Sequence, residues 1–438
     1  MASASLTRTP SSNGNRQVFT FSMWLKRSKL GSTQYFLSQG SDNDNNFAMY
    51  FDANDHMGMW DYGSGYNWRY TTNRKFKDPN AWYHVLLRAS TTDGTAQDRM
   101  KLYINGVQET SFSTNTTASS NLNTHVNQSG NALKIGIYTS GSSYFDGSIA
   151  HFHLADGTAY TPSTFGETDA TTGIWKPKTS PTVTYGTNGF FLEFNNSANM
   201  GLDTSGQTNN LTTSGTVIQT KDTPSNFFTA NNNLWAQEST RILTFTNINN
   251  MISGGGSSTW YQCPATLAFS KGKYYWECKF NAGTNLDKNT PGVIDYKKTQ
   301  ESGQFQDKTG SVFYKNEDGG ETRIDGSTSS ADYGTLAQND ILGVAVDMDA
   351  ATPTVKFYKN GSLLVTANAS SLAGKTVTPA HMIYTSGEYQ VNYGNGYFGT
   401  TAVSSAQNPD DGVGIFEHDP PSGYRALCTK SINAQEYS

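Results

Sequence analysis

Residues 341–364 read ILGVAVDMDAATPTVKFYKNGSLL and decide the fold class of the second half of the chain. A short run rich in β-branched residues, Ile341–Val346, is followed after a polar break by a second run, Val355–Tyr358. The second run leads into Asn360 and Gly361, and the apolar pattern then resumes. Asn-Gly between alternating segments is the strongest short-range hairpin signal, because a type I′ turn needs positive φ at both central residues. The stretch therefore predicts a three-stranded antiparallel meander without a helix.

The same pattern, K-[LF]-Y-[IK]-N-G, occurs twice, at Lys101–Gly106 and at Lys356–Gly361. Two copies so far apart predict two domains built on one all-β plan, and they do not form a short-period repeat array. The segment Asn195–Thr223 is rich in Gly, Asn, Ser and Thr, as interdomain segments are. We therefore predict a first domain over residues 1–220 and a second over residues 221–438.

Strand patterns run through both halves of the chain. Val18–Leu25 alternates, with Phe19, Phe21 and Met23 on one face. Asn281–Asp332 carries few apolar anchors and predicts large loops. Since no segment as far as Ala155 shows a helical period, many short strands with frequent turn signals predict two tandem antiparallel β-sandwiches.

Composition narrows the classes of partner. The 438 residues include 15% charged side chains, a formal net charge of −5 and no run of Lys or Arg, which argues against nucleic acid. The three cysteines form no C-x-x-C pair, and we expect Cys263 and Cys278 to be buried thiols. The N-terminus lacks the apolar core of a signal peptide, and no apolar run is long enough to cross a bilayer. We expect no membrane insertion and no ordinary secretion signal.

Catalytic motifs give no support for an enzyme. Glycan hydrolysis on a sandwich needs two carboxylates at a fixed separation, but Glu193 stands alone on its predicted strand. The sequence from Gly394 to Gly399, GNGYFG, matches G-x-G-x-x-G. That motif needs a following helix, and Thr400–Asp411 has no helical period. We expect a protein without catalytic residues.

An aromatic stretch, WDYGSGYNWRY, spans Trp60–Tyr70. If Gly63–Gly65 is a three-residue hairpin loop, Tyr62 faces Tyr66 and Trp60 faces Trp68, so all four point to one side with Tyr70 beyond them. Such a face is either the sandwich core or a platform that stacks on sugar rings. The candidate glycan-binding residues are Trp60, Tyr62, Tyr66, Trp68, Arg69 and Tyr70.

Two groups of residues suggest metal sites. Asp42 and Asp44 imitate the start of an EF-hand loop, but the required Gly and Glu are Phe47 and Ala53. These two aspartates remain candidate Ca²⁺ ligands, and no other cofactor is expected. His151 and His153 lie two apart on a predicted strand and share a face, which is more typical of a sheet surface than of a metal pair.

Each half of the chain resembles a different known family. The first half looks like a concanavalin A-like or LamG-type jelly roll in the order of FTFSMWLK at Phe19–Lys26, WYHV at Trp82–Val85, KLYINGV at Lys101–Val107 and GSIAHFHLAD at Gly147–Asp156. The second half is similar to the SPRY domain in GKYYWE at Gly272–Glu277, ILGVAVDMD at Ile341–Asp349 and VKFYKNG at Val355–Gly361. LamG-like domains often bind Ca²⁺ through loop carboxylates, which is a second reason to consider Asp42 and Asp44.

Four further segments resemble virion proteins of marine tailed bacteriophages, in which a LamG-like and a SPRY-like sandwich occur in tandem. They are TRTPSSNGNR at Thr7–Arg16, WLKRSK at Trp24–Lys29, DTPS at Asp222–Ser225 and PSGYRAL at Pro421–Leu427. The resemblance implies a virion structural protein, assembled in the host cytoplasm with other virion proteins. It further implies a tail-fibre-type adhesin that binds host surface glycans, and such proteins are commonly homotrimers.

Two alternatives stay open. The short N-terminus leaves no room for an anchoring domain, which favours a capsid decoration or capsid-fibre protein that binds the shell lattice. A glycan depolymerase would need carboxylates that distant loops bring together.

Overall fold

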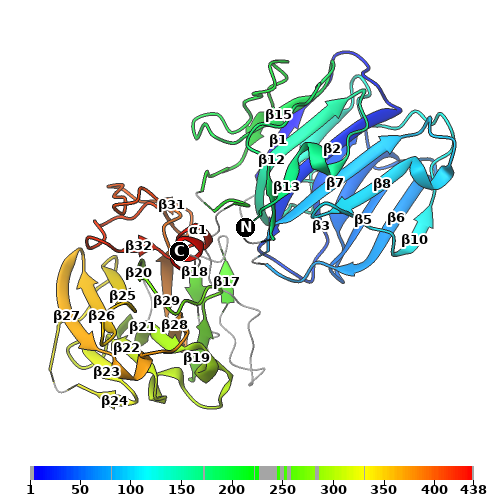
Figure 1. Ribbon diagram of the computed structural model, residues 1–438. Coiled ribbons are helices and arrows are strands. Elements are labelled where there is room, and N and C mark those ends of the chain that lie inside the picture. The colour runs from blue at the N-terminus through cyan, green and yellow to red at the C-terminus, as the bar shows by residue number, and fades with distance from the viewer. Residues whose placement is uncertain are drawn as a thin grey trace. The chain divides into compact units, whose positions relative to one another are not determined.

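The computed structural model describes residues 4–79, 81–170, 173–220, 222–225, 244–246, 251–253, 258–281, 286–329 and 331–436. The chain divides into two compact units, Met1–Gln219 and Thr220–Ser438 (Figure 1). Each unit consists of two large sheets whose strands are almost all antiparallel. The predicted fold class, an all-β chain with tandem β-sandwiches, is confirmed.

The first unit has one eight-stranded and one six-stranded sheet. In spatial order the larger sheet contains β10 (Phe112–Thr116), β6 (Tyr66–Lys75), β5 (His56–Gly63), β4 (Asn45–Phe51), β3 (Gln34–Gly40), β11 (Ala132–Ile135), β1 (Ser5–Arg8) and β16 (Thr212–Ser214). The smaller sheet contains β15 (Phe190–Leu192), β12 (Gly147–Asp156), β2 (Val18–Arg27), β7 (Tyr83–Ser90), β8 (Met100–Ile104) and β9 (Val107–Gln108). A separate hairpin joins β13 (Gly166–Thr168) to β14 (Trp175–Pro177).

The core of the first unit lies between its two sheets. Phe19, Phe21 and Met23 alternate along β2 and are fully buried, as the period of two predicts. Across the core, the Phe21 ring stacks on that of Phe47 from β4, with centroids 5.6 Å apart. These contacts identify the inner faces of the two sheets. The opposite face of the larger sheet points away from this core.

The second unit also has two large sheets. The larger contains β17 (Thr244–Thr246), β18 (Met251–Ser253), β29 (Glu388–Asn392), β20 (Lys273–Phe280), β25 (Ile341–Asp347), β26 (Thr354–Lys359) and β27 (Ser362–Asn368), and β32 (Arg425–Ala426) pairs in parallel with β20. The smaller contains β19 (Trp260–Pro264), β28 (Val377–Tyr384), β21 (Asn289–Asp295), β22 (Ser311–Lys315), β23 (Glu321–Ile324) and β24 (Ser327–Thr328). A short hairpin joins β30 (Tyr397–Phe398) to β31 (Thr401–Ala402).

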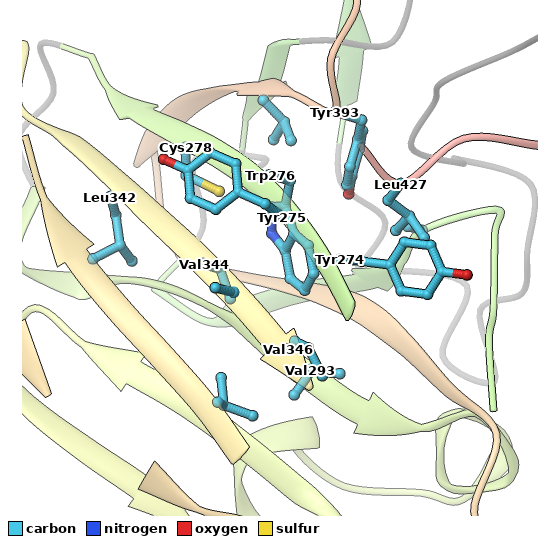
Figure 2. Packing of buried hydrophobic residues seen from close by; sticks show 14 of the residues in the cluster. Tyr274, Tyr275, Trp276, Cys278, Val293, Leu342, Val344, Val346, Tyr393 and Leu427 are labelled. Carbon is cyan, nitrogen blue, oxygen red and sulfur yellow. The ribbon is translucent and has the colours of Figure 1, made fainter. Parts of the chain in front are cut away.

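β20 lies inside the larger sheet of the second unit and is covered on both faces. Trp276 belongs to the core cluster together with Val344 of β25 and Val293 of β21 (Figure 2). The neighbouring residue Tyr275, also a member of this cluster, contacts Phe416 of the C-terminal segment, with ring centroids 5.0 Å apart. The C-terminal segment therefore forms a further layer against this sheet.

One prediction for the second unit is wrong. Asn281–Asp332, expected to hold large loops, contains the four strands β21 to β24 in its described part. Val293, Val312 and Tyr314 are fully buried and anchor these strands. The strands are short and several of their residues are polar, so a few buried anchors suffice to attach them to β28.

Both copies of the Asn-Gly motif form the predicted turn. Asn105 and Gly106 have φ of 50° and 82°, and Asn360 and Gly361 have φ of 48° and 82°. The meander predicted from Ile341 onward is therefore present as β25, β26 and β27.

Each turn asparagine also binds the first strand of its meander, the strand that precedes the hairpin in the sequence. The Asn360 side chain accepts a hydrogen bond from the backbone N–H of Ile341 at 2.8 Å, and its own backbone N–H donates to the Ile341 carbonyl at 2.9 Å. Asn105 makes the same pair of contacts with His84, at 2.8 and 2.9 Å. In both copies of the motif, the same asparagine thus closes a turn and hydrogen-bonds to the neighbouring strand.

Replacing Asn360 by alanine is expected to lower the free energy of unfolding of the second unit by about 2 kcal/mol. About 1 kcal/mol comes from the lost side-chain hydrogen bond to Ile341, and about 1 because alanine tolerates positive φ less well than asparagine. Asn360→Gly keeps the backbone geometry and is expected to cost about 1 kcal/mol. Urea unfolding measures both values, and an alanine variant as stable as wild type would contradict this role.

Helices contribute little to the described chain. They comprise α1 (Thr429–Glu436) and short 3₁₀ turns at Ala96–Asp98, Pro162–Thr164, Leu286–Lys288, Tyr296–Gln300, Phe305–Asp307 and Ser370–Leu372. Within the residues that the structure describes, no helix has the length and hydrophobicity required to span a bilayer.

Candidate functional site: an aromatic patch on the outer face of the first unit

The hairpin of β5 and β6 carries the aromatic stretch found in the sequence. Tyr62 is paired with Tyr66 as predicted, and their rings meet edge to face at 5.0 Å. A register shift follows directly, so that Asp61 is paired with Trp68 and Trp60 with Arg69. The predicted pairing of Trp60 with Trp68 is therefore wrong, because a bulge moves every residue after it to the opposite face.

The bulge places two of the candidate residues in the core. Trp68 is 0% exposed and Tyr70 is 3% exposed, and both belong to the core of the first unit. The Trp68 ring lies 6.1 Å from Phe47 and 5.8 Å from Tyr70. These two residues support the sandwich and are not available to a ligand, which corrects their assignment as glycan-binding residues.

The other four candidates lie together on the outer face of the larger sheet. They meet aromatic residues from β3, β4 and the bend after β11, which the sequence did not single out. We call this group the outer aromatic patch; it consists of Tyr35, Tyr50, Trp60, Tyr62, Tyr66, Arg69 and Tyr138.

Trp60 occupies the middle of the outer aromatic patch. Its ring centroid lies 4.8 Å from that of Tyr50, 5.9 Å from Tyr35 and 6.1 Å from Tyr66. Its indole N–H donates to the Asn46 side chain at 3.0 Å. The ring is thus held at one orientation by packing and by a hydrogen bond, as a recognition surface requires.

The strand pairing explains how the rings fit on one sheet face. Tyr35 is paired with Tyr50 across β3 and β4, and their rings stack at 5.0 Å. Tyr50 is in turn paired with Gly58, where an added Cβ would lie 2.3 Å from the Tyr50 ring. Glycine at this position therefore makes room for the ring.

Burial decreases across the patch. Tyr50 is almost fully buried, Tyr35, Trp60 and Tyr138 are half-buried, and Tyr66 is 45% exposed. Burial raises the pKa of Tyr35, Tyr50 and Tyr138 above the ordinary tyrosine value. Their hydroxyls stay neutral at pH 7 and can both donate and accept hydrogen bonds.

Arg69 supplies the positive charge of the patch. Its guanidinium lies over the Tyr66 ring, 4.6 Å from the centroid, in a cation–π contact. The same guanidinium lies beside Tyr50 and opposes the increase in the pKa of that hydroxyl caused by burial. The patch therefore combines ring faces, hydroxyl groups and one cation.

Asp61 does not join this surface. Its carboxylate is fully buried and accepts hydrogen bonds from the His125 backbone at 2.7 Å, the His125 ring at 3.0 Å and Asn67 at 2.7 Å. It fastens the segment after β10 to the sheet, so its role is structural.

The candidate calcium ligands lie in the exposed turn between β3 and β4. Hydrogen bonds from the Ser41 hydroxyl, the Asp44 backbone N–H and the Asn45 side chain lower the pKa of Asp42. No group of three or more His, Cys, Asp or Glu suited to a metal occurs among the described residues. Two aspartates supply fewer oxygens than the six to eight that Ca²⁺ takes, and a calcium site at Asp42 and Asp44 stays a prediction.

A buried serine–histidine pair in the smaller sheet has a structural role. His84 Nε2 lies 2.9 Å from the Ser22 hydroxyl, and the Trp175 indole N–H donates to Nδ1 at 2.9 Å. Burial lowers the pKa of His84 to about 3, so the ring is neutral. Since Nδ1 accepts, Nε2 carries the proton and donates to Ser22, which is opposite to what activation of a serine nucleophile needs.

Three other sequence features have structural explanations. His153 is buried, contacts the Tyr185 hydroxyl at 2.9 Å and stacks on Phe191, and His151 stacks on the same Phe191 ring. All three cysteines are buried free thiols, as predicted for Cys263 and Cys278. The G-x-G-x-x-G segment runs into β30 and β31 and opens no helix, so its rejection is confirmed.

Comparison with known proteins agrees with the architecture of the first unit. Residues 2–164 match the family described as the concanavalin A-like lectin/glucanases superfamily, Laminin_G_3. The first unit is therefore similar to a concanavalin A-like domain over these residues. A search of curated proteins found no match.

Solved structures similar to this chain include SPRY domains and a pentraxin. The SPRY domain of human HERC1 is 18% identical, with a TM-score of 0.28, and the similarity covers 32% of this chain and 87% of that one. The TRIM65 PSpry domain is 17% identical, with a TM-score of 0.28, covering 35% and 86%. The native heptameric SAP-like pentraxin from Limulus polyphemus is 20% identical, with a TM-score of 0.27, covering 36% and 71%.

Proposed function

We propose that this chain is a non-enzymatic structural protein of a tailed-phage particle, a tail-fibre-type adhesin that binds host surface glycans. The observation that carries the proposal is the outer aromatic patch. Half-buried Trp and Tyr rings with adjacent hydroxyls and a cation combine apolar area with polar groups that fix orientation. The match of residues 2–164 to a superfamily of lectins and glucanases supports the same kind of ligand.

The assignment to a phage particle is supported by the sequence segments that resemble virion proteins of marine tailed phages. A patch of this kind binds a single sugar weakly, and many copies on one particle would give avidity. The neutral polar composition, with 15% charged residues, suits a particle surface that must avoid nonspecific adhesion.

Replacing Tyr66 or Trp60 by alanine is expected to weaken binding to host surface polysaccharide by tenfold or more, because each removes a ring from the patch. Tyr103→Ala is the matched control, since it removes a partly exposed tyrosine from β8 in the other sheet. Biolayer interferometry on immobilised polysaccharide measures binding, and unfolding curves verify that each variant is folded. Equal losses in all three variants, or in none, would contradict a site at the patch.

Cryo-electron microscopy of the particle tests the placement. Density at the tail periphery supports the adhesin. Density on the capsid lattice contradicts it and favours a decoration protein. Release of reducing sugar from the bound polysaccharide would contradict the non-enzymatic part of the proposal.

A further inference from the structure

Arg69 differs from Arg74 and Arg88 of the first unit in its partners. On the same strand, Arg74 pairs with Glu109 at 2.7 Å, and Arg88 of β7 pairs with Asp93 at 2.9 Å. Among the described residues, Arg69 has no such carboxylate. Its Nε is buried and has no hydrogen-bond partner among the residues that the structure describes. The guanidinium instead contacts the Tyr66 ring and hydrogen-bonds to the Tyr50 hydroxyl.

The half-buried guanidinium therefore has a hydroxyl and a ring as partners but no counter-ion among the described residues, and its Nε makes no hydrogen bond to them. The planar guanidinium fork matches carboxylate and related oxyanions, and ring stacking holds it in a fixed plane. The protein therefore holds the Arg69 guanidinium in a fixed plane, and none of the described residues supplies an anionic partner for it.

We propose that the outer aromatic patch binds a sugar that carries an anionic substituent, and that Arg69 binds this substituent while Trp60 and Tyr66 contact the sugar ring. The proposal rests on the glycan-binding function proposed above and specifies its ligand. It makes Arg69 a specificity-determining residue, because a neutral sugar leaves the guanidinium unpaired.

The charges around the patch determine which end of it the anionic substituent of the bound sugar occupies. Asp42 and Asp44 lie near Tyr138, whose pKa they help to raise. Two carboxylates at that end repel an anionic group. The anionic substituent therefore lies at the Arg69 end. Since the whole chain has a net charge of −5, nonspecific attraction of polyanions is disfavoured.

The test uses two pairs of polymers with the same sugar backbone, one anionic and one neutral in each pair: polygalacturonate with its fully methyl-esterified form, and dextran sulfate with dextran. Wild type is expected to bind at least one anionic polymer tenfold or more tightly than its neutral counterpart, and the pair that discriminates identifies carboxylate or sulfate. Arg69→Gln is expected to abolish the discrimination. Lys75→Gln, which removes an exposed cation from the end of the same strand, is expected to preserve it.

The outcomes separate this proposal from the one on which it rests. If wild type binds neither anionic polymer better than its neutral form, or if Arg69→Gln and Lys75→Gln act alike, anionic specificity is overturned. Binding to host polysaccharide that is lost in Tyr66→Ala but unchanged in Arg69→Gln would leave the glycan-binding function standing. Polysaccharide binding that survives Tyr66→Ala and Trp60→Ala overturns both.

Discussion

Trp68→Ala is expected to lower the free energy of unfolding of the first unit by about 3–5 kcal/mol, the cost typical of removing a large buried aromatic side chain. Trp68 is fully buried and packs against Phe47 and Tyr70. Its indole N–H has no hydrogen-bond partner among the described residues, so the loss is one of packing and cavity formation. Calorimetry of the full chain measures the effect, with the second unit as an internal reference.

Two further variants make this result specific to the core. Trp68→Phe keeps much of the buried area and is expected to cost less than Trp68→Ala. Trp60→Ala removes a half-buried ring from the outer face, and a cost of about 1–2 kcal/mol is expected. A Trp68→Ala protein that melts like wild type but no longer binds polysaccharide would instead place Trp68 in the ligand site.

Glu277→Gln is expected to remove a pH dependence of stability that wild type shows between about pH 4.5 and 7. Burial of Glu277 raises the pKa of its carboxyl from 4.5 to about 7. Backbone N–H groups of Glu417 and His418 donate to it at 2.9 and 2.8 Å and act in the opposite direction. Tyr275 and Asn392 are its other polar neighbours.

The sign follows from proton binding. Between about pH 4.5 and 7 the folded protein keeps the proton on Glu277 and the unfolded chain releases it, so stability decreases as pH rises through this window. The full decrease is on the order of 3 kcal/mol, at 1.36 kcal/mol per pKa unit. Urea unfolding at several pH values measures the slope, which Glu277→Gln should flatten.

Glu417→Gln is the matched control for the Glu277 experiment. The Glu417 carboxylate accepts hydrogen bonds from Ser404, and its pKa is lowered, so it does not titrate in this window. This variant should therefore retain the wild-type slope. A stability that rises from pH 5 to 7 and loses that rise in Glu277→Gln would contradict the proposed protonation state.

The fold was predictable where local turn chemistry determines it. Asn360 and Gly361 are residue types that adopt positive φ readily, so this pair alone indicates a type I′ turn. The meander could therefore be inferred from a few adjacent residues. The strands in Asn281–Asp332 were missed because their attachment depends on isolated anchors such as Val293, which is paired with Pro379 of the distant strand β28.

The candidate site shows the same division. The pairing of Tyr62 with Tyr66 follows from the short loop between them, but the bulge beyond it coincides with Asp61, which is bonded to the distant His125. No local pattern reveals that contact. Tyr50 had a detectable signal, because it alternates with the apolar residues Phe47, Met49 and Phe51 and so belongs to the outer face. Tyr35 and Tyr138 join the patch through long-range strand pairing.

The two Asn-Gly turns have a consequence for synthesis on the ribosome. The Trp175 ring lies against Gly106, and the His418 ring lies against Gly361. In each unit the residue that covers the turn is translated long after the turn itself. A meander that forms during translation therefore has its turn uncovered until the covering segment leaves the exit tunnel and docks. Translation pauses placed before Trp175 or His418 would lengthen the life of these incomplete sandwiches.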